Sequence, residues 1–371
     1  MKKLILLLVI FVPVIVFSCK KEPITLKKAT PLSAPVSNTF AAAAAAATTS
    51  SSWIHQIIPF KYSIMESIQF LDVNNGYCVG MRITPHFSSA VLKTTDGGNT
   101  WIETCLPIEG HEYSDVFFTS LSVGYVVGHI IGFPSKTLIK KTVDGGITWV
   151  QQTSPIEMGA LFSVTFTSPT TGIIVGSDNG NSIILKTTDG GFTWNTKLAA
   201  VNTNCMSVDF PTTNVGYICG QGFIRLPSYI MKTNNGGETW TSQKTNIKDG
   251  VLEDIKFIDE NNGFAVGYQI YDTTISDFKT PIILKTSNGG STWTKLTLPK
   301  KNFFFQAKTV WMNDIFTIYV GGEKLIKTTN GGISWVIENT PIIQDFFVYS
   351  IYFTNPTNGY ACGNNSIIKH L

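Results

Sequence analysis

The sequence predicts an all-β fold: a seven-bladed β-propeller of four-stranded antiparallel blades, closed by the N-terminal strand joining the last blade. Two repeated motifs, and the way in which the two chain ends complement each other, lead to this prediction. Both motifs recur along the 371 residues, and the tryptophans of the first motif are spaced 42 to 53 residues apart. Repetition with a period in the forties is typical of propellers, in which each repeat forms one blade.

The first motif is an eight-residue turn that reads Thr-x-Asp/Asn-Gly-Gly-x-Thr/Ser-Trp and occurs six times. Its acidic or amide residues and its tryptophans are Asp96 and Trp101, Asp144 and Trp149, Asp189 and Trp194, Asn235 and Trp240, Asn288 and Trp293, and Asn330 and Trp335. Its glycines predict a tight turn between the third and fourth strands, because glycine tolerates the positive φ that such turns need. A general acid cannot be exchanged for an amide, whereas a side chain that caps a turn can. We therefore expect a structural role for these residues.

The second motif is an aromatic residue, five free residues and then Gly-aromatic-x-x-Gly. Its seven copies are Phe70–Gly80, Phe118–Gly128, Phe166–Gly176, Phe210–Gly220, Phe257–Gly267, Phe353–Gly363 and a weaker one at Met312–Gly322. The first strand of each blade is expected to end near the aromatic residue, and the second strand follows the first glycine. An apolar run before the Gly-Gly turn, such as Ala90–Lys93, supplies the third strand, and the fourth begins at the tryptophan. Short β-branched and aromatic runs between turn signals favour this all-β interpretation.

The two ends of the chain predict how the ring closes. The seventh repeat stops at Leu371, before its turn and fourth strand, while Ser51–Pro59 looks like a fourth strand with nothing before it. Trp53 also precedes Trp101 by 48 residues, which is the spacing of one blade. We expect this N-terminal strand to complete the last blade, because closure removes the open sheet edges of the array.

The repeated turn resembles the Asp-box of bacterial neuraminidase repeats. Its combination with Gly-Tyr-x-x-Gly is similar to the photosystem II stability/assembly factor-like propellers, over about Trp53 to Leu371. The resemblance implies a scaffold or assembly role for a membrane-associated complex. Members of that family resemble one another in an arginine-rich recognition patch. Arg82 and Arg225 are the only arginines of this chain and cannot build such a patch, which argues against a literal photosystem role.

The N-terminus predicts export and a lipid anchor. Two lysines precede an apolar run, Leu4–Phe17, which is too short for an ordinary membrane span. Ser18 and Cys19 follow and resemble a bacterial lipobox with an acylated Cys19; a plain signal peptide with a chance cysteine is the alternative. The predicted organisation is a lipoprotein signal peptide over 1–18, a low-complexity tether over 19–50 and the propeller over 51–371. We expect the protein in the cell envelope, anchored to a membrane.

Composition and motifs exclude several kinds of function. The formal charge of +3 is too small for the concentrated basic field that nucleic-acid binding requires. Scattered cysteines and histidines predict neither a metal site nor a cofactor. A sialidase is disfavoured, because such sites resemble one another in holding the substrate carboxylate with three arginines. Other glycoside hydrolases need two carboxylates. The candidates Glu109, Glu112, Asp115, Glu253 and Asp254 are expected to be ordinary loop charges, so no catalytic residue is predicted.

The loops between second and third strands differ sharply among blades and are long and apolar in four of them. In a propeller they share one face with the connections between blades, opposite the Gly-Gly turns. The predicted binding face carries Phe87, Phe133, Phe223, Arg225, Tyr271, Phe278 and Phe303. Protruding aromatic residues of this kind usually mark an interface; the alternative is that they fold back and seal the mouth of the ring. We predict non-enzymatic binding of a protein partner, with a glycan-binding protein or glycoside hydrolase of the sialidase-like propeller type as the alternative.

Overall fold

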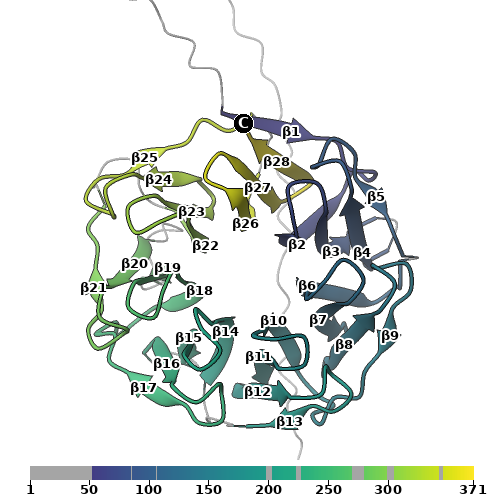
Figure 1. Cartoon of the computed structure of the whole chain (residues 1–371), viewed down its shortest axis with the longest axis horizontal. Coiled ribbons are helices and arrows are strands. Elements are labelled where there is room, and N and C mark those ends of the chain that lie inside the picture. Colours follow the sequence, from purple (N-terminus) through teal and green to yellow (C-terminus); the bar gives the residue numbers. More distant parts are fainter. Residues whose placement is uncertain are drawn as a thin grey trace, which may run out of the picture. The chain divides into compact units, whose positions relative to one another are not determined.

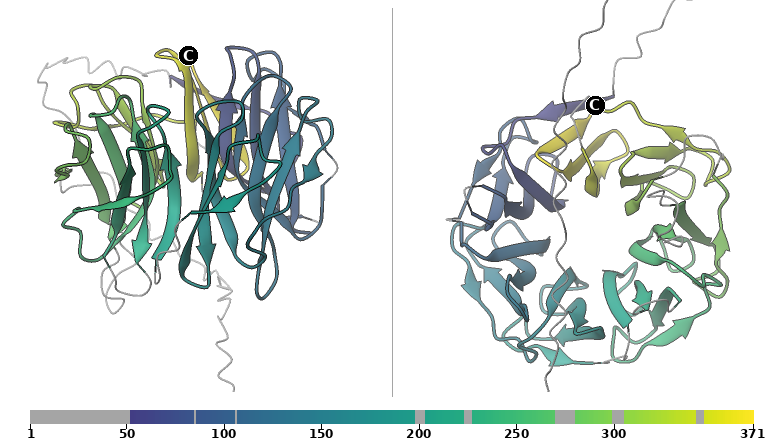
Figure 2. Two further views of the ribbon diagram at one scale, coloured as in Figure 1. Left: turned by 60° about the horizontal axis from the view of Figure 1, so that its bottom comes forward. Right: turned by 180° about the vertical axis from the view of Figure 1, so that it is seen from behind.

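The computed structural model describes residues 52–84, 86–105, 107–197, 203–222, 227–269, 280–298, 305–341 and 346–371. These residues form seven four-stranded antiparallel sheets arranged in a ring, and no helix occurs among them (Figure 1). Strands run between the two faces of the propeller, as the tilted view in Figure 2 shows. The predicted fold class is therefore confirmed.

The sheets are built from the axis outwards in chain order. The innermost strands are β2 (Ser63–Phe70), β6 (His111–Phe118), β10 (Ala160–Phe166), β14 (Thr203–Asp209), β18 (Val251–Phe257), β22 (Ala307–Met312) and β26 (Val348–Asn355). The second strands are β3 (Gly76–Arg82), β7 (Gly124–Ile130), β11 (Gly172–Asp178), β15 (Gly216–Gly222), β19 (Gly263–Gln269), β23 (Ile318–Gly322) and β27 (Asn358–Gly363). We number the blades 1 to 7 in this order.

The third strands are β4 (Ser88–Thr94), β8 (Lys136–Thr142), β12 (Asn181–Thr187), β16 (Tyr229–Thr233), β20 (Thr280–Thr286), β24 (Ile326–Thr328) and β28 (Ser366–His370). The outermost strands are short: β5 (Ile102–Glu103), β9 (Val150–Gln151), β13 (Asn195–Thr196), β17 (Thr241–Gln243), β21 (Thr294–Lys295) and β25 (Val336–Ile337). Blade 7 takes its outermost strand from the N-terminus, as β1 (Trp53–Gln56) pairs with β28.

Ring closure rests on Trp53. This residue pairs with His370 across the β1–β28 ladder and is 1% exposed. Its ring makes edge-to-face contacts with Tyr319, Phe353 and His370, and its indole N–H donates to Glu338 Oε2 at 3.1 Å. The N-terminal strand thus binds blade 7 and also contacts blade 6, which confirms the predicted closure.

A β-bulge at the same position of every innermost strand shapes the channel. In blade 1 the register with β3 shifts between Met65 and Ser67, leaving Glu66 as the bulged residue. The last glycine of the second motif lies opposite: a Cβ on Gly80 would collide with the carbonyl oxygen of Ile64. Close backbone approach at the bulge therefore explains why this position must be glycine.

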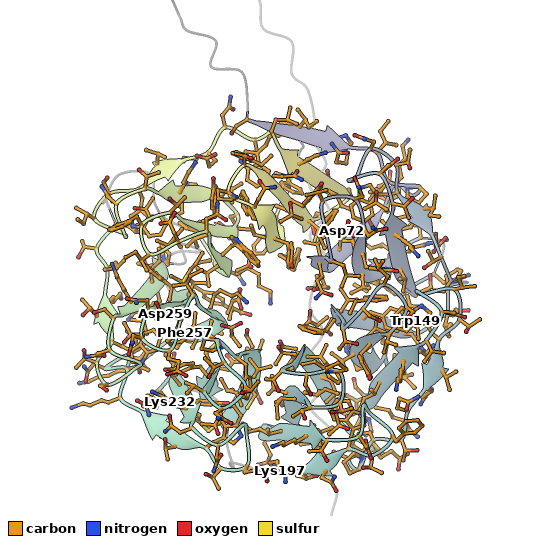
Figure 3. All side chains as sticks on the ribbon, viewed as in Figure 1. Asp72, Trp149, Lys197, Lys232, Phe257 and Asp259 are labelled. Carbon is orange, nitrogen blue, oxygen red and sulfur yellow. The ribbon has the colours of Figure 1, made fainter. Side chains whose placement is uncertain are left out.

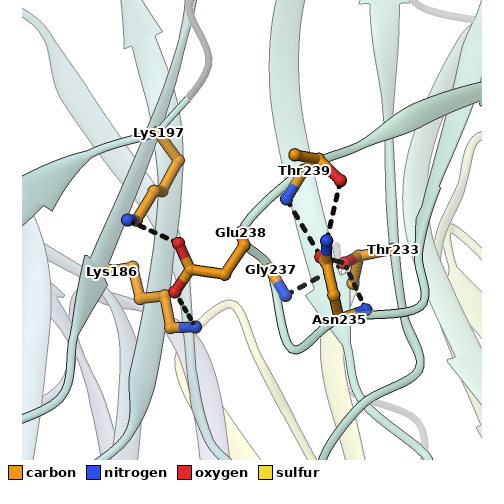
Figure 4. Close-up of polar contacts among 7 residues, drawn as sticks. All are labelled: Lys186, Lys197, Thr233, Asn235, Gly237, Glu238 and Thr239. Atoms are coloured by element: carbon orange, nitrogen blue, oxygen red, sulfur yellow. Dashed lines mark hydrogen bonds and ion pairs between the residues drawn. The ribbon is translucent and has the colours of Figure 1, made fainter.

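The Gly-Gly turns are held by their own side chains. In blade 1, Asp96 accepts hydrogen bonds from Thr100 N (2.9 Å) and Thr100 Oγ1 (2.6 Å). In blade 4, Asn235 Oδ1 accepts from Thr239 N at 3.0 Å, while Asn235 Nδ2 donates to Thr239 Oγ1 at 2.9 Å (Figure 4). Because the threonine hydroxyl can donate or accept, acid and amide build the same turn.

A lysine and a tyrosine join neighbouring blades at these turns. Lys93 Nζ and Tyr77 Oη of blade 1 both donate to the carbonyl of Gly145 in blade 2, each at 3.0 Å. Blade 3 has Ile173 in place of the tyrosine, and there Lys186 pairs with Glu238 of blade 4 at 2.6 Å (Figure 4). In blades 1 to 5, the lysine that precedes the motif tryptophan by eight residues is thus an inter-blade contact.

Candidate binding site at the mouth of the axial channel

The two faces of the propeller differ in the segments that form them. On the turn face, Gly97 N donates to Asn74 O at 2.9 Å, which joins the Gly-Gly turn of blade 1 to the turn between its first two strands. On the opposite face, Gly110 N donates to Phe87 O at 2.8 Å and joins the loop after β3 to the connection between blades 1 and 2. We call this second face the loop face. Each innermost strand begins there and runs toward the turn face.

A cavity of about 280 Å³ lies on the axis and is lined by residues of all seven innermost strands. Side chains of these strands project toward the axis, whereas Trp149 and Lys197 lie at the outer rim (Figure 3). The seven bulged residues contribute to the lining: Glu66, Ser114, Phe162, Met206, Glu253, Lys308 and Tyr349. Glu112, near the start of β6, also lines it, so the cavity lies in the half of the channel nearer the loop face.

The floor of the cavity is a ring of residues that directly follow the bulges. Every blade has a hydroxyl or a carboxylate there: Ser67, Asp115, Ser163, Ser207, Asp254, Thr309 and Ser350. Asp115 accepts from Ser67 Oγ at 2.6 Å and from Val164 N at 2.8 Å, which links blades 1, 2 and 3. Burial raises the pKa of Asp115 to about 6, although these hydrogen bonds favour the ionised form.

Asp254 links blades 4, 5 and 6 in the way that Asp115 links blades 1, 2 and 3. It accepts from Ser207 Oγ at 2.7 Å, from Val310 N at 2.9 Å and from Thr309 Oγ1 at 3.1 Å. Burial raises the pKa of this carboxyl as well. Both aspartates therefore hold neighbouring blades together, and their oxygens are occupied by donors of the protein itself.

The expectation that Glu112, Asp115, Glu253 and Asp254 are loop charges is wrong. All four belong to the innermost strands β6 and β18 and line the cavity. Of the five candidates, Glu109 alone lies outside these strands; it is exposed, and its carboxylate is 3.9 Å from His86 Nδ1. The four were misplaced because polar residues at the start of a strand look like a loop when the channel they face is not considered.

The other charged side chains of the cavity differ in whether they have an ion-pair partner. Lys308 Nζ contacts Glu253 Oε2 at 2.9 Å, and Glu253 is 8% exposed. Glu112 Oε2 lies 3.7 Å from His129 Nε2. The Glu66 carboxylate makes no hydrogen bond or ion pair with another described residue. Burial raises its pKa from 4.5 to about 7; Lys308 opposes the shift, and Glu112 and Glu253 add to it.

A second pocket of about 170 Å³ lies deeper along the axis. Its main charged contact is between Lys256 Nζ and Asp209 Oδ1, at 2.6 Å. Asp209 Oδ2 also accepts from Phe257 N at 2.8 Å, and Lys256 lies over the ring of Trp311, 5.4 Å from its centroid. Both charged groups are paired within the protein. The charged side chain without such a partner among the described residues, Glu66, lies in the cavity near the loop face.

Two of the seven residues proposed for the binding face are described by the structure, and both are accessible. Phe87 is 51% exposed and Phe133 is fully exposed, on the loop face of blades 1 and 2. Phe223, Arg225, Tyr271, Phe278 and Phe303 lie outside the described residues, as does Cys19 with the tether. Within the described ranges, no group of three potential ligands could hold a metal ion, and no helix is long and apolar enough to cross a membrane.

The cavity-lining residues could have been found by aligning the repeats differently. When the seven copies are aligned on the motif aromatic, the residue three positions before it is Ser, Thr or Asp in every blade. The residue four positions before it is the bulged one, and it is Glu, Ser, Phe, Met, Lys or Tyr, depending on the blade. This signal lies just upstream of the second motif, outside the residues that define it.

These features define a seven-bladed β-propeller with a polar cavity at one end of its axial channel. Within that class the chain belongs to the family of the photosynthesis system II assembly factor YCF48, whose model matches residues 45–154 and 148–249, more than half of the chain. The predicted family resemblance is confirmed. Among curated protein sequences, none matches the chain.

Solved structures show the same fold. YCF48 bound to a D1 peptide superposes with a TM-score of 0.64 at 16% identity, over 86% of this chain and 97% of that one. YCF48 from Cyanidioschyzon merolae superposes with a TM-score of 0.61 at 20% identity, over 86% of this chain and 98% of that one. A GH74 xyloglucanase from Xanthomonas campestris gives 0.61 at 10% identity, over 85% of this chain but 52% of the enzyme. At such identities these likenesses concern the fold alone.

Proposed function

We propose that this protein is a non-enzymatic binding scaffold that holds a protein partner on its loop face. The observation that carries the proposal is the peptide-bound structure of YCF48, a propeller of the same family. In this chain the loop face presents Phe87 and Phe133 to solvent. Exposed aromatic residues of this kind supply anchors for partner binding.

We propose further that the scaffold is a lipoprotein of the cell envelope, tethered through Cys19. Support comes from the sequence of residues 1–50 alone: a basic start, a short apolar run, the lipobox-like cysteine and a spacer rich in alanine and proline. Labelling of growing cells with a palmitate analogue tests this. Wild type should incorporate the label and Cys19→Ser should not; incorporation by both would refute the anchor.

Glycan binding or glycoside hydrolysis is the competing function, because GH74 enzymes share the fold and carboxylates line the cavity. Two features speak against hydrolysis. The oxygens of Asp115 and Asp254 accept hydrogen bonds from neighbouring blades, which leaves them poorly placed as nucleophile or base. Glu253 is held by Lys308. We therefore expect no turnover of xyloglucan or aryl glycosides.

Crosslinking of the full-length protein in its native membrane tests the scaffold proposal. The partner captured by wild type should be lost from the double variant Phe87→Ser, Phe133→Ser. Phe192→Ser is the matched control, because this aromatic is 81% exposed but belongs to a Gly-Gly turn on the opposite face. Capture that survives the double variant, or falls equally in the control, would refute binding through these residues. Glycoside turnover that stops in Glu253→Gln would favour the enzyme instead.

A further inference from the structure

The side chains at the bulges of the innermost strands differ from blade to blade, and the propeller fold does not require any particular one of them. One position further along, every blade needs a small hydrogen-bonding residue, since that ring joins the blades around the axis. At the bulge itself the fold only needs backbone, because the side chain projects into the channel. The side chains chosen there therefore reflect what the cavity holds.

These side chains divide the cavity into an anionic wall and an apolar wall. Blades 5, 6, 7 and 1 contribute Glu253, Lys308, Tyr349 and Glu66 at their bulges. Blade 2 has Ser114 at its bulge and adds Glu112 from two residues earlier in β6. Three carboxylates thus surround one ammonium group. The remaining blades, 3 and 4, contribute Phe162 and Met206 at their bulges. The cavity is therefore acidic on one side and suited to methylene groups on the other.

Glu66 is the carboxylate of this wall that has no ion pair or hydrogen bond of its own among the described residues, although Lys308 attracts it through space. Lys308 lies against Glu253, and Glu112 has His129 as its neighbour. Glu66 has no such contact with any described residue, and the residue is partly buried in the cavity wall. An isolated carboxylate in this position is costly unless a cation approaches it. A volume of about 280 Å³ is smaller than a typical drug-sized pocket and suits a single side chain or a small amine.

We propose that this cavity binds an organic cation, an ammonium or guanidinium group on an apolar stem, and that Glu66 provides its main counter-charge. Phe162 and Met206 receive the stem, and Tyr349 offers an aromatic face to the head group. Two sources supply such a group: a lysine or arginine of the partner, in which case the inference rests on the proposed scaffold function, or a free amine. The chemistry of the cavity is the same for both.

Calorimetric titration of the full-length protein at pH 8 tests the inference. Agmatine represents the free cation, and the peptide Gly-Gly-Arg-Gly-Gly represents the side chain, with Gly-Gly-Gln-Gly-Gly as its neutral control. We expect at least one cationic probe to bind, no binding of the neutral peptide, and at least tenfold weaker binding to Glu66→Gln. Agmatine binding alone identifies a free amine, and peptide binding alone identifies a basic side chain; both support the site.

Glu109→Gln is the matched control, because it removes one carboxylate from the same face but outside the cavity. It should bind the probes as wild type does. Equal weakening by both variants would mean general attraction to an acidic surface and would overturn the site, as would the absence of binding by either cationic probe. Glu66→Gln is expected to fold, since the Glu66 side chain holds no described neighbour, and a thermal melt verifies this.

The pH dependence gives a second readout. The groups that face Glu66 are Lys308, Glu112, Glu253 and Tyr349, and among them Glu66 has its pKa raised by burial to about 7. Cation affinity should therefore rise between pH 6 and pH 8 in wild type, and this rise should be smaller in Glu66→Gln. An unchanged rise in the variant would contradict the role of Glu66. If the wild type captures its partner but binds neither cationic probe, the cavity site is rejected and the scaffold function stands.

Discussion

Replacing Trp53 with alanine should detach the N-terminal strand from blade 7 and open the ring between blades 7 and 1. The Trp53 side chain is 1% exposed and touches Tyr319, Phe353 and His370. Truncation of a buried tryptophan typically costs about 3–5 kcal/mol. The lost indole bond to Glu338 adds about 1 kcal/mol, a modest amount because that carboxylate keeps access to water. We expect a loss of about 5 kcal/mol in the free energy of unfolding.

Two further variants separate the contributions. Trp53→Phe keeps an aromatic ring against Tyr319 and Phe353 but removes the donor to Glu338, so it should cost about 1–2 kcal/mol. Trp194→Ala removes an equally buried tryptophan, 5% exposed, from a blade whose four strands are continuous in the chain. Its cost should be similar to that of Trp53→Ala, but it should not release a chain end.

Urea denaturation measures these energies, and hydrogen exchange of the same variants locates the damage. In Trp53→Ala, amide exchange should accelerate in β1 and β28, which pair over four residues, more than in blade 3. Trp194→Ala should show the reverse distribution. A Trp53→Ala variant within about 1 kcal/mol of wild type, or with exchange unchanged in β28, would show that the N-terminal strand does not hold the ring.

Three other perturbations follow from the channel and the bulges. Glu66 destabilises the fold when ionised, because its pKa is raised from 4.5 to about 7 in the folded state. The free energy of unfolding should therefore be highest below pH 4.5 and fall by about 3 kcal/mol by pH 8. Urea titrations between pH 5 and pH 8 should show this loss in wild type and a smaller one in Glu66→Gln. Asp254→Ala should cost about 3 kcal/mol, since it leaves the buried Val310 N–H without its acceptor; a change below 1 kcal/mol in the urea midpoint would contradict the bridging role. Gly80→Ala should prevent soluble expression or cost more than about 3 kcal/mol, because its Cβ would meet the backbone at the bulge. Gly110→Ala, which has open space but a φ of 73°, should cost only about 1–2 kcal/mol, and equal melting temperatures for the two variants would refute the steric argument.

The sequence was enough for the architecture because propeller repeats encode local geometry. The Gly-Gly turn, the glycine opposite the bulge and the tryptophan each meet a requirement within one blade, so they recur and can be counted. Closure could also be predicted, since Trp53 and Leu371 mark two halves of one blade. Contacts between blades are less visible in the sequence. A lysine recurs eight residues before each motif tryptophan, but its bond to the next turn, as from Lys93 to Gly145, depends on how the blades stack.

The candidate site could not be predicted from the same repetition. Asp115 and Asp254 look like unrelated charges in sequence, but each occupies the first position after a bulge and joins three blades. Glu66 and Lys308 look like ordinary surface residues because they stand in strands with polar neighbours. Their proximity arises only when seven strands surround one axis, and this is a property of the closed ring.

The positions that do not repeat are the ones from which function can be inferred. Most repeated residues of each blade are explained by stability. Threonine and aspartate or asparagine hold the turn, glycine lets the second strand approach the bulge, and a hydroxyl or carboxylate at the cavity floor joins the blades. At the bulge none of these constraints acts on the side chain, and there the chain places Glu66, Glu253 and Lys308 around the axis, opposite Phe162 and Met206. An unpaired, partly buried carboxylate such as Glu66 costs stability above its pKa, and a cation that enters the cavity would offset that cost. The same residue should therefore link binding to stability: agmatine or the arginine peptide should raise the unfolding midpoint of wild type at pH 8 and leave that of Glu66→Gln unchanged.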